Sequence, residues 1–150
     1  MQIQRVQSLY LLLATVLLVV FLFIPFGYSV MMVDGEERIV EDWCGYQMLG
    51  MAIPAAIAAV LALVDIFLFK NFPLQKLVAK LDILLILVTV GITIYTLVSG
   101  FNDVTPGDEI VNTKWGGGGL LLLAALIAVG MALSRITSDE KLLKSMDRLR

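Results

Sequence analysis

Charged residues are absent from four stretches of this chain, and each stretch is long enough to cross a lipid bilayer as a helix. The stretches without Asp, Glu, Lys or Arg are residues 6–33, 43–64, 83–102 and 115–134. Because a helix rises ~1.5 Å per residue, about 20 apolar residues cross the ~30 Å hydrocarbon core. The pattern predicts an all-α integral membrane protein, built as a four-helix bundle. The predicted spans are residues 8–27, 46–69, 81–100 and 116–134.

The composition supports this assignment and argues against most enzyme classes. Hydrophobic residues make up 59% of the chain and charged residues 16%, whereas soluble domains average about 45–50% apolar and about 25% charged. Histidine is absent, which removes the commonest metal ligand and the usual general base. The single cysteine, Cys44, excludes an intrachain disulfide and a cysteine-rich metal site. We expect no enzymatic activity, no cofactor and no metal, and we expect Cys44 to be a small buried hydrophobe.

The first apolar run begins like a signal peptide but is longer than the apolar region of one. Arg5 precedes the run, as in a signal peptide, but residues 9–26 are all uncharged. A signal peptide has an apolar region of only about 7–15 residues. We therefore expect this segment to be an uncleaved span.

The distribution of basic residues predicts the orientation of the bundle. Nine of the eleven Lys and Arg residues fall on the side that holds both termini and the middle connection. They are Arg5, Lys70, Lys76, Lys80, Arg135, Lys141, Lys144, Arg148 and Arg150. The two opposite loops contain Arg38 and Lys114 but eight acids, including Asp103, Asp108 and Glu109. The positive-inside rule then places both termini in the cytoplasm.

Small residues predict how the spans pack. Span two has Ala pairs four residues apart between Ala52 and Ala62, and span four has Ala124, Ala128 and Ala132. Such spacing lets helix backbones approach closely. We expect spans two and four to lie inside the bundle against each other, with spans one and three facing lipid. These faces are also the candidate contacts with other membrane proteins or with a second copy of the chain.

Two connections have features of their own. The acidic loop at 27–45 is expected to be partly ordered, with Trp43 and Tyr46 at the level of the lipid headgroups. Four glycines occupy 116–119, which weakens the start of a helix or indicates a close backbone approach. We therefore expect the fourth helix to begin near Leu120.

The last residues predict a separate element. Thr137 and Glu140 have the spacing of a capping box, which marks the start of a helix. A short amphipathic helix over 137–150 follows, so that the bundle itself covers 1–136. Its apolar stripe consists of Leu142, Leu143, Met146 and Leu149, and its basic face of Lys141, Lys144, Arg148 and Arg150. Such a helix is suited to anionic lipid headgroups, which we favour, or to a partner protein.

Two acids lie inside or at the margin of a predicted span, Asp65 and Asp82. An acid at the centre of a membrane helix costs ~2.5–3.5 kcal/mol on insertion scales, so such residues are candidates for function. Thr89 and Thr93 follow Asp82 on the same helical face. Their hydroxyls either form a hydrophilic lining or bond back to carbonyls of their own helix.

Both a functional and a structural role are open for the two acids. As a functional pair, Asp65 and Asp82 would bind a proton or a cation near the cytoplasmic face. As structural residues, Asp82 would cap its helix, and Asp65 would pair with one of the lysines at 70, 76 and 80. Both acids lie near the membrane surface, where water reduces the cost of burial, which favours the structural role.

Three segments resemble a known family. They are Gln4–Ala14 (QRVQSLYLLLA), Ile66–Asn71 (IFLFKN) and Ser138–Arg150 (SDEKLLKSMDRLR). They are similar to the bacterial membrane family called domain of unknown function 4293, in the same order along essentially the whole chain. The resemblance implies a protein of the bacterial inner membrane with four spans, and it implies no activity.

Two hypotheses for function follow from these observations. The first is a non-catalytic accessory or structural subunit of a larger membrane complex. The second is a small oligomeric transporter or ion-conducting protein that uses Asp65 and Asp82. The partners expected in either case are the lipid bilayer and membrane proteins, and nothing in the charge pattern indicates binding to nucleic acid.

Overall fold

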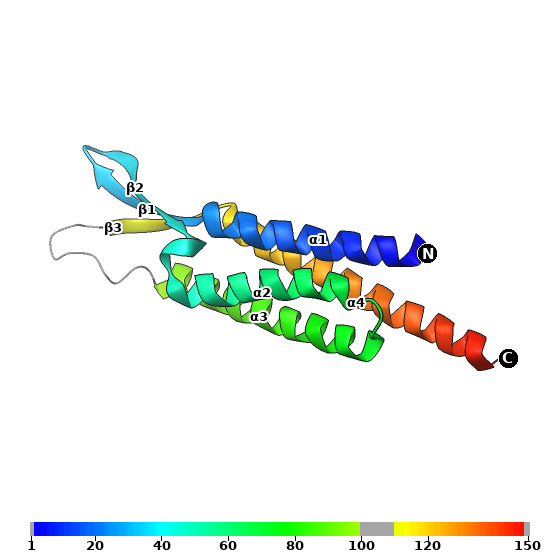
Figure 1. Ribbon diagram of the computed structural model, residues 1–150. Coiled ribbons are helices and arrows are strands. Elements are labelled where there is room, and N and C mark those ends of the chain that lie inside the picture. The colour runs from blue at the N-terminus through cyan, green and yellow to red at the C-terminus, as the bar shows by residue number, and fades with distance from the viewer. Residues whose placement is uncertain (1, 100–109, 149–150) are drawn as a thin grey trace.

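Four helices run side by side in the computed structural model, which describes residues 2–99 and 110–148 (Figure 1). All four are long and apolar enough to cross a membrane. Their bounds are Gln2–Phe23 for α1, Leu49–Phe67 for α2, Phe72–Ser99 for α3 and Gly118–Arg148 for α4. Both described chain ends lie at one end of the bundle, here called the terminal end, and a small sheet lies at the other, the sheet end. The acids at 103, 108 and 109, with Leu149 and Arg150, lie outside the described residues.

Each helix contacts two neighbours in a square arrangement. α1 packs against α2 and α4, and α3 packs against the same two helices. Within the described residues α2 and α4 are therefore diagonal to each other, and the expectation that they form a pair was wrong. Their small residues instead give room to the larger side chains of the adjacent helices, such as Leu18 and Phe21. Ala124 is exposed, while Ala128 and Ala132 are buried as expected.

The buried positions of all four helices alternate in steps of four and three residues. Such heptad spacing lets one seam of each helix face the centre of the bundle. The seam residues are Gln7, Leu11, Ala14, Leu18 and Phe21 in α1; Met51, Ala55, Ala58, Ala62 and Asp65 in α2; Gln75, Ala79, Asp82, Ile86, Thr89 and Thr93 in α3; and Gly118, Leu122, Ala125, Val129, Ala132 and Ile136 in α4.

A three-stranded antiparallel sheet corrects the all-α prediction. Its strands are β1 (Pro25–Val33), β2 (Glu36–Cys44) and β3 (Ile110–Trp115), in the order β2-β1-β3. The connection from β1 to β2 is the pair Asp34 and Gly35, whose φ angles are 55° and 82°. Positive φ at two central residues is typical of a tight hairpin turn, and Asp-Gly is a preferred pair for it. The acidic loop at 27–45 is thus mostly a β-hairpin.

All four helices have bounds that differ from the expected spans, and α1 covers Gln2–Phe23 instead of 8–27 because the chain enters β1 at Pro25. α2 begins at Leu49 after a short 3-10 turn, Gly45–Gln47. α3 begins at Phe72 rather than near residue 81, with Pro73 in its first turn, where proline is well tolerated. α4 begins at Gly118 and continues without a break to Arg148, so the separate helix over 137–150 was wrong. Residues 131–148 contain no Gly or Pro that would end a helix.

The glycines before α4 allow a close backbone approach. A Cβ on Gly116 would lie 2.4 Å from the carbonyl oxygen of Pro25, and one on Gly118 would lie 2.6 Å from that of Ile24. Either distance is far below van der Waals contact, so a side chain would force the backbone to move. These two glycines therefore seat the start of α4 against the start of β1.

Large apolar side chains fill the core at the sheet end. The ring centroid of Phe26 lies 6.4 Å from that of Phe21 and 6.4 Å from that of Trp43. The Trp43 side chain is 2% exposed, whereas Tyr46 is 54% exposed. Cys44 is buried beside this cluster, as expected, and its Sγ donates a hydrogen bond to the Phe23 carbonyl at 3.5 Å.

Candidate functional site

Near the terminal end the seam changes from apolar to polar side chains. The residues involved are Gln7 of α1, Asp65 of α2, and Gln75 and Asp82 of α3, which we call the polar layer. Their exposed fractions are 3%, 0%, 1% and 1%. Three helices thus bring four polar side chains into a core whose buried residues are mainly apolar. The layer unites both candidate acids with two glutamines that the sequence did not single out.

Few hydrogen bonds satisfy the polar layer. Gln75 Nε2 donates to the backbone carbonyl of Asp65 at 3.2 Å. Within the described residues, the carboxylate oxygens of Asp65 and Asp82, Oε1 of Gln75 and Nε2 of Gln7 have no hydrogen-bond partner. Asp65 and Asp82 are buried seam residues of the adjacent helices α2 and α3, so two ionised carboxylates would repel each other in the same part of the core. Buried polar atoms are nearly always hydrogen-bonded, so this arrangement needs an explanation.

The two structural roles expected for the acids do not fit. Asp82 lies well inside α3, which begins at Phe72, and so it does not cap the helix. Among the described ion pairs none includes Asp65, because Lys76 pairs with Glu140 of α4 instead. Lys70 and Lys80 are exposed, and the Lys70 ammonium lies 5.8 Å from the centroid of its neighbour's ring at Phe69.

The threonines of α3 are buried but are bonded within their own helix. The Thr89 hydroxyl donates to the Leu85 carbonyl at 2.9 Å, and the Thr93 hydroxyl donates to the Thr89 carbonyl at 2.8 Å. Thr93 also lies 3.7 Å from Sδ of Met51. Of the two interpretations given for this stripe, the structure supports bonding back to the helix.

The core between the polar layer and the sheet end offers no free polar group among the described residues, because the hydroxyls of its buried threonines, Thr15, Thr89 and Thr93, each donate to a carbonyl of their own helix. The seam residues next to the layer are Leu11, Ala62, Ile86 and Val129, and each is fully buried. The aromatic cluster follows beyond them. Within the described residues, no row of free polar groups therefore leads from the layer through the bundle.

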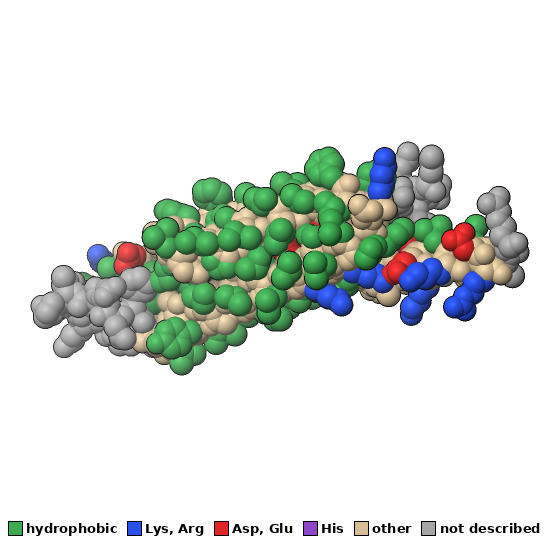
Figure 2. Space-filling model, turned by 60° about the horizontal axis from the view of Figure 1, so that its bottom comes forward, with side chains coloured by type: hydrophobic (Ala, Val, Ile, Leu, Met, Phe, Trp, Pro, Cys, Tyr) green, Lys and Arg blue, Asp and Glu red, His purple; other side chains and the backbone are tan. Residues whose placement is uncertain are grey.

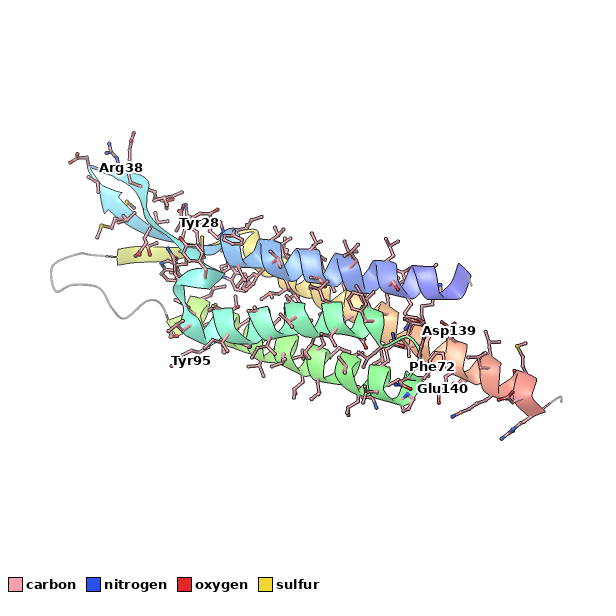
Figure 3. The ribbon with its side chains drawn as sticks, viewed as in Figure 1. Tyr28, Arg38, Phe72, Tyr95, Asp139 and Glu140 are labelled. Atoms are coloured by element: carbon pink, nitrogen blue, oxygen red, sulfur yellow. The ribbon has the colours of Figure 1, made fainter. Side chains whose placement is uncertain are left out.

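The second candidate region is the part of α4 that extends beyond the other helices, residues 137–148, which we call the extension. Figure 3 places Asp139 and Glu140 beside Phe72, the first residue of α3. The exposed cations of the extension are Lys141, Lys144 and Arg148, which gather with other Lys and Arg at this end of the molecule (Figure 2). The exposed apolar residues are Leu142, Leu143 and Met146 at 55%, 49% and 65%. The fourth expected cation, Arg150, lies outside the described residues.

An ion-pair network holds the base of the extension against α3. Glu140 accepts hydrogen bonds from Lys144 one turn later and from Lys76 of α3. These two bonds lower the pKa of Glu140 to about 2. The hydroxyl of Thr137 donates to the Leu133 carbonyl at 2.8 Å, as it does inside a continuous helix, so the predicted capping box is not formed. The extension is therefore a fixed continuation of the bundle.

The seam of α4 continues into the extension. Steps of three and four residues lead from Ile136 to Asp139, Leu143 and Met146. The first of these residues lies level with the start of α3, whereas the last two are exposed because no described helix faces them. The extension thus carries an apolar seam without a helix opposite it.

An apolar recess of about 110 Å³ lies at the sheet end. Its lining includes Phe26, Leu97, Trp115 and Leu122. The hydroxyl of Thr93 also lines it, but that group is already bonded within α3. The recess offers van der Waals contact and no directed hydrogen bond, so it is not a candidate for chemistry.

Comparison with known proteins identifies the family of the chain. A search of curated proteins finds no match to the chain. The family model described as Domain of unknown function (DUF4293) matches residues 3–149, which is nearly the whole chain. The resemblance seen in the three sequence segments is thereby confirmed, and the protein belongs to the DUF4293 family.

Proposed function

We propose that this protein is a four-span protein of the bacterial inner membrane that acts as a non-catalytic accessory subunit of a larger membrane complex. The observation that carries the proposal is the extension, whose apolar seam continues that of α4 with no described helix facing it. A partner helix from another protein would bury Leu142, Leu143 and Met146. The small size of the chain and its many apolar contact surfaces agree with such a role.

The surface of the bundle supports insertion into a membrane. Figure 2 shows hydrophobic side chains over most of the middle of the molecule, with charged side chains at the ends. Exposed Leu, Ile and Val occur along all four helices, and a soluble monomer rarely exposes such a large continuous apolar patch. The 19 residues of α2 span about 28 Å, close to the ~30 Å hydrocarbon core.

The charge distribution supports cytoplasmic termini. The described cations of the terminal end are Lys70, Lys76, Lys80, Arg135, Lys141, Lys144 and Arg148. The sheet end has Arg38 and Lys114 among acids such as Glu37 and Asp42. Under the positive-inside rule the terminal end faces the cytoplasm, and the extension is then available to a cytoplasmic or membrane partner.

The extension follows the direction of the bundle (Figure 1), and this favours a protein partner over the lipid surface. A helix that lies on headgroups runs along the membrane plane, whereas α4 leaves the bundle as an unbroken helix fixed to α3 by Lys76 and Glu140. Between the polar layer and the sheet end the buried threonines are bonded within their own helices and the other described seam residues are apolar, which argues against an ion pathway through one copy. These two points favour the accessory role over the transporter.

The test is affinity purification of the tagged full-length protein in mild detergent, with native mass and protein identification. The variant Leu142→Ser/Leu143→Ser/Met146→Ser removes the seam, and Lys141→Ser/Arg148→Ser, on the opposite face, is the control. We expect a stoichiometric membrane partner with the native chain and the control, and its loss with the seam variant. A lone homo-oligomer from the native chain would contradict the accessory role. If the partner is lost only from the control variant, the cations and not the apolar seam bind the partner.

A further inference from the structure

We propose that the polar layer binds one exchangeable monovalent cation, a proton or a sodium ion, between the carboxylates of Asp65 and Asp82. The site goes beyond the accessory role, because it concerns the interior of the bundle and not the extension. It is formed by three helices and would exist only in the folded bundle.

The charge of the layer requires a cation. Removing an ionised carboxylate from water costs several kcal/mol in real proteins unless an opposite charge or hydrogen bonds compensate. Asp65 and Asp82 are 0% and 1% exposed, and no Lys or Arg among the described residues pairs with either. α1 contributes the neutral Gln7, and α4 contributes Ala132 and Ile136, followed one step nearer the terminal end by Asp139, a further acid whose Oδ2 is buried without a hydrogen-bond partner among the described residues. One positive charge shared by the two acids relieves their repulsion, as a shared proton does in aspartic proteases.

The second observation is the pair of glutamines at the layer. Oε1 of Gln75 and Nε2 of Gln7 are buried, and neither has a hydrogen-bond partner among the described residues. Because Gln75 Nε2 donates to the backbone carbonyl of Asp65, its amide oxygen lies on the Asp65 side of the pair, where it can coordinate a cation. An amide N–H such as that of Gln7 can donate to a carboxylate oxygen whose charge the cation only partly neutralises. A bound cation would thus give both glutamine atoms a bonding partner.

The ligand set favours a monovalent cation over a divalent one. The layer offers four carboxylate oxygens and one amide oxygen, a set that suits hard cations. Calcium takes about 6–8 oxygen ligands, and magnesium keeps several waters. A proton or a sodium ion is compatible with two carboxylates in a confined, largely apolar core.

Access is from the terminal end only. Asp65 lies near the end of α2, which stops at Phe67, so the short connection to α3 lies next to the layer. In the other direction Leu11, Ile86 and Val129 close the core. The cation therefore exchanges with the solution at the terminal end, and the site binds an ion without conducting it.

The sodium arm uses the purified full-length protein in detergent, with thermal unfolding followed as NaCl replaces choline chloride at constant ionic strength and pH. Ligand that binds only the folded state raises the unfolding midpoint in a saturable way. If sodium is the ligand, we expect this rise in the native chain, its loss in Asp65→Asn and Asp82→Asn, and its retention in Asp147→Asn, where the acid is exposed on the extension.

The proton arm uses infrared spectroscopy of the native chain without sodium. The measured signal is the carbonyl stretching band of a protonated carboxyl group. If the proton is the ligand, this band is present at neutral pH and is lost in either layer variant but not in Asp147→Asn. The native-chain measurements do not depend on whether a variant folds. Absence of both the sodium response and the carboxyl band would overturn the proposal, and so would a response to magnesium alone.

Discussion

The two ends of the bundle core have the same helix geometry and opposite chemistry. At the sheet end, Phe21, Phe26 and Trp43 pack with Met51 in a layer of large apolar side chains. At the terminal end, the same heptad positions hold Asp65 and Asp82 with two glutamines. The seam continues unchanged through both, so the packing geometry does not require the polar residues.

The difference separates stability from a candidate function. The sheet end buries a large apolar area, which is the main favourable contribution to folding. Its glycines, Gly116 and Gly118, allow the start of α4 to approach the backbone at the start of β1. The polar layer leaves buried groups without partners, which costs free energy. Substitutions at the two ends should therefore change stability with opposite signs.

The largest expected effect is at the aromatic cluster. Trp43→Ala removes a side chain that is 2% exposed and leaves a cavity, which should lower the free energy of unfolding by about 3–5 kcal/mol. Trp115→Ala is the matched control, because that side chain is 72% exposed. Thermal unfolding in detergent measures both. If both variants lower the free energy of unfolding equally, the burial of Trp43 in the core at the sheet end is not the cause.

A smaller loss is expected where α4 meets β1. Gly116→Ala places a Cβ 2.4 Å from the Pro25 carbonyl oxygen, and the forced backbone shift should cost about 1–3 kcal/mol. Gly117→Ala is the control, since nothing lies within 4 Å of its added Cβ. The same unfolding assay compares them. If Gly117→Ala is as destabilising as Gly116→Ala, the close approach is not the cause.

The polar layer should respond with the opposite sign. Without sodium, Asp82→Asn replaces an acid with a neutral side chain of the same shape, and it should raise the free energy of unfolding by about 1 kcal/mol. Asp147→Asn, on the exposed extension, should leave it unchanged. Chemical denaturation in detergent is the measurement. A loss comparable to that of Trp43→Ala would show that Asp82 stabilises the core, and the contrast between the two ends would disappear.

The smallest expected effect is at the base of the extension. Lys76→Gln removes one of the two bonds to Glu140 and should increase hydrogen exchange over residues 141–148 by a few-fold without changing global stability. Lys80→Gln, an exposed lysine of the same helix, is the control. Faster exchange in both variants would mean that the Lys76 bond does not hold the extension.

The same contact predicts a pH dependence. The pKa of Glu140 falls from 4.5 to about 2 on folding. A lowered pKa contributes stability that is complete above the unfolded value and is lost as the pH falls through the folded value. Protection of the extension should therefore decrease between pH of about 4.5 and about 2. Exchange measured across that range, corrected for its intrinsic pH dependence, tests this in the native chain and in Glu140→Gln, which should show no such change.

The sequence predicted the four apolar helices because each one leaves an uncharged stretch of the necessary length. It did not predict their ends, because charged residues such as Lys76 and Lys80 are good helix formers and extend α3 beyond the apolar stretch. The hairpin was missed although Asp34 and Gly35, between two strand-like runs, are a strong turn signal.

The candidate site was predicted in part. The acids at 65 and 82 were singled out by charge alone, but their burial together with Gln7 and Gln75 depends on the heptad register of three helices. The alternation of seam positions in α1 and α3 is present in the sequence and would have placed both glutamines on the core face. Which helices are neighbours is not encoded in small-residue spacing, and so the pairing of α2 with α4 was wrong.

Gln75 and Lys76 are consecutive residues of α3, and they bond to two different neighbouring helices, α2 and α4. Gln75 donates to Asp65 at the polar layer, while Lys76 donates to Glu140 at the base of the extension. A small rotation of the first turns of α3 therefore changes both contacts at once. The start of α3 thus connects the polar layer inside the bundle to the base of the extension, so a change in the state of the acids would also move the part of α4 for which we propose a partner.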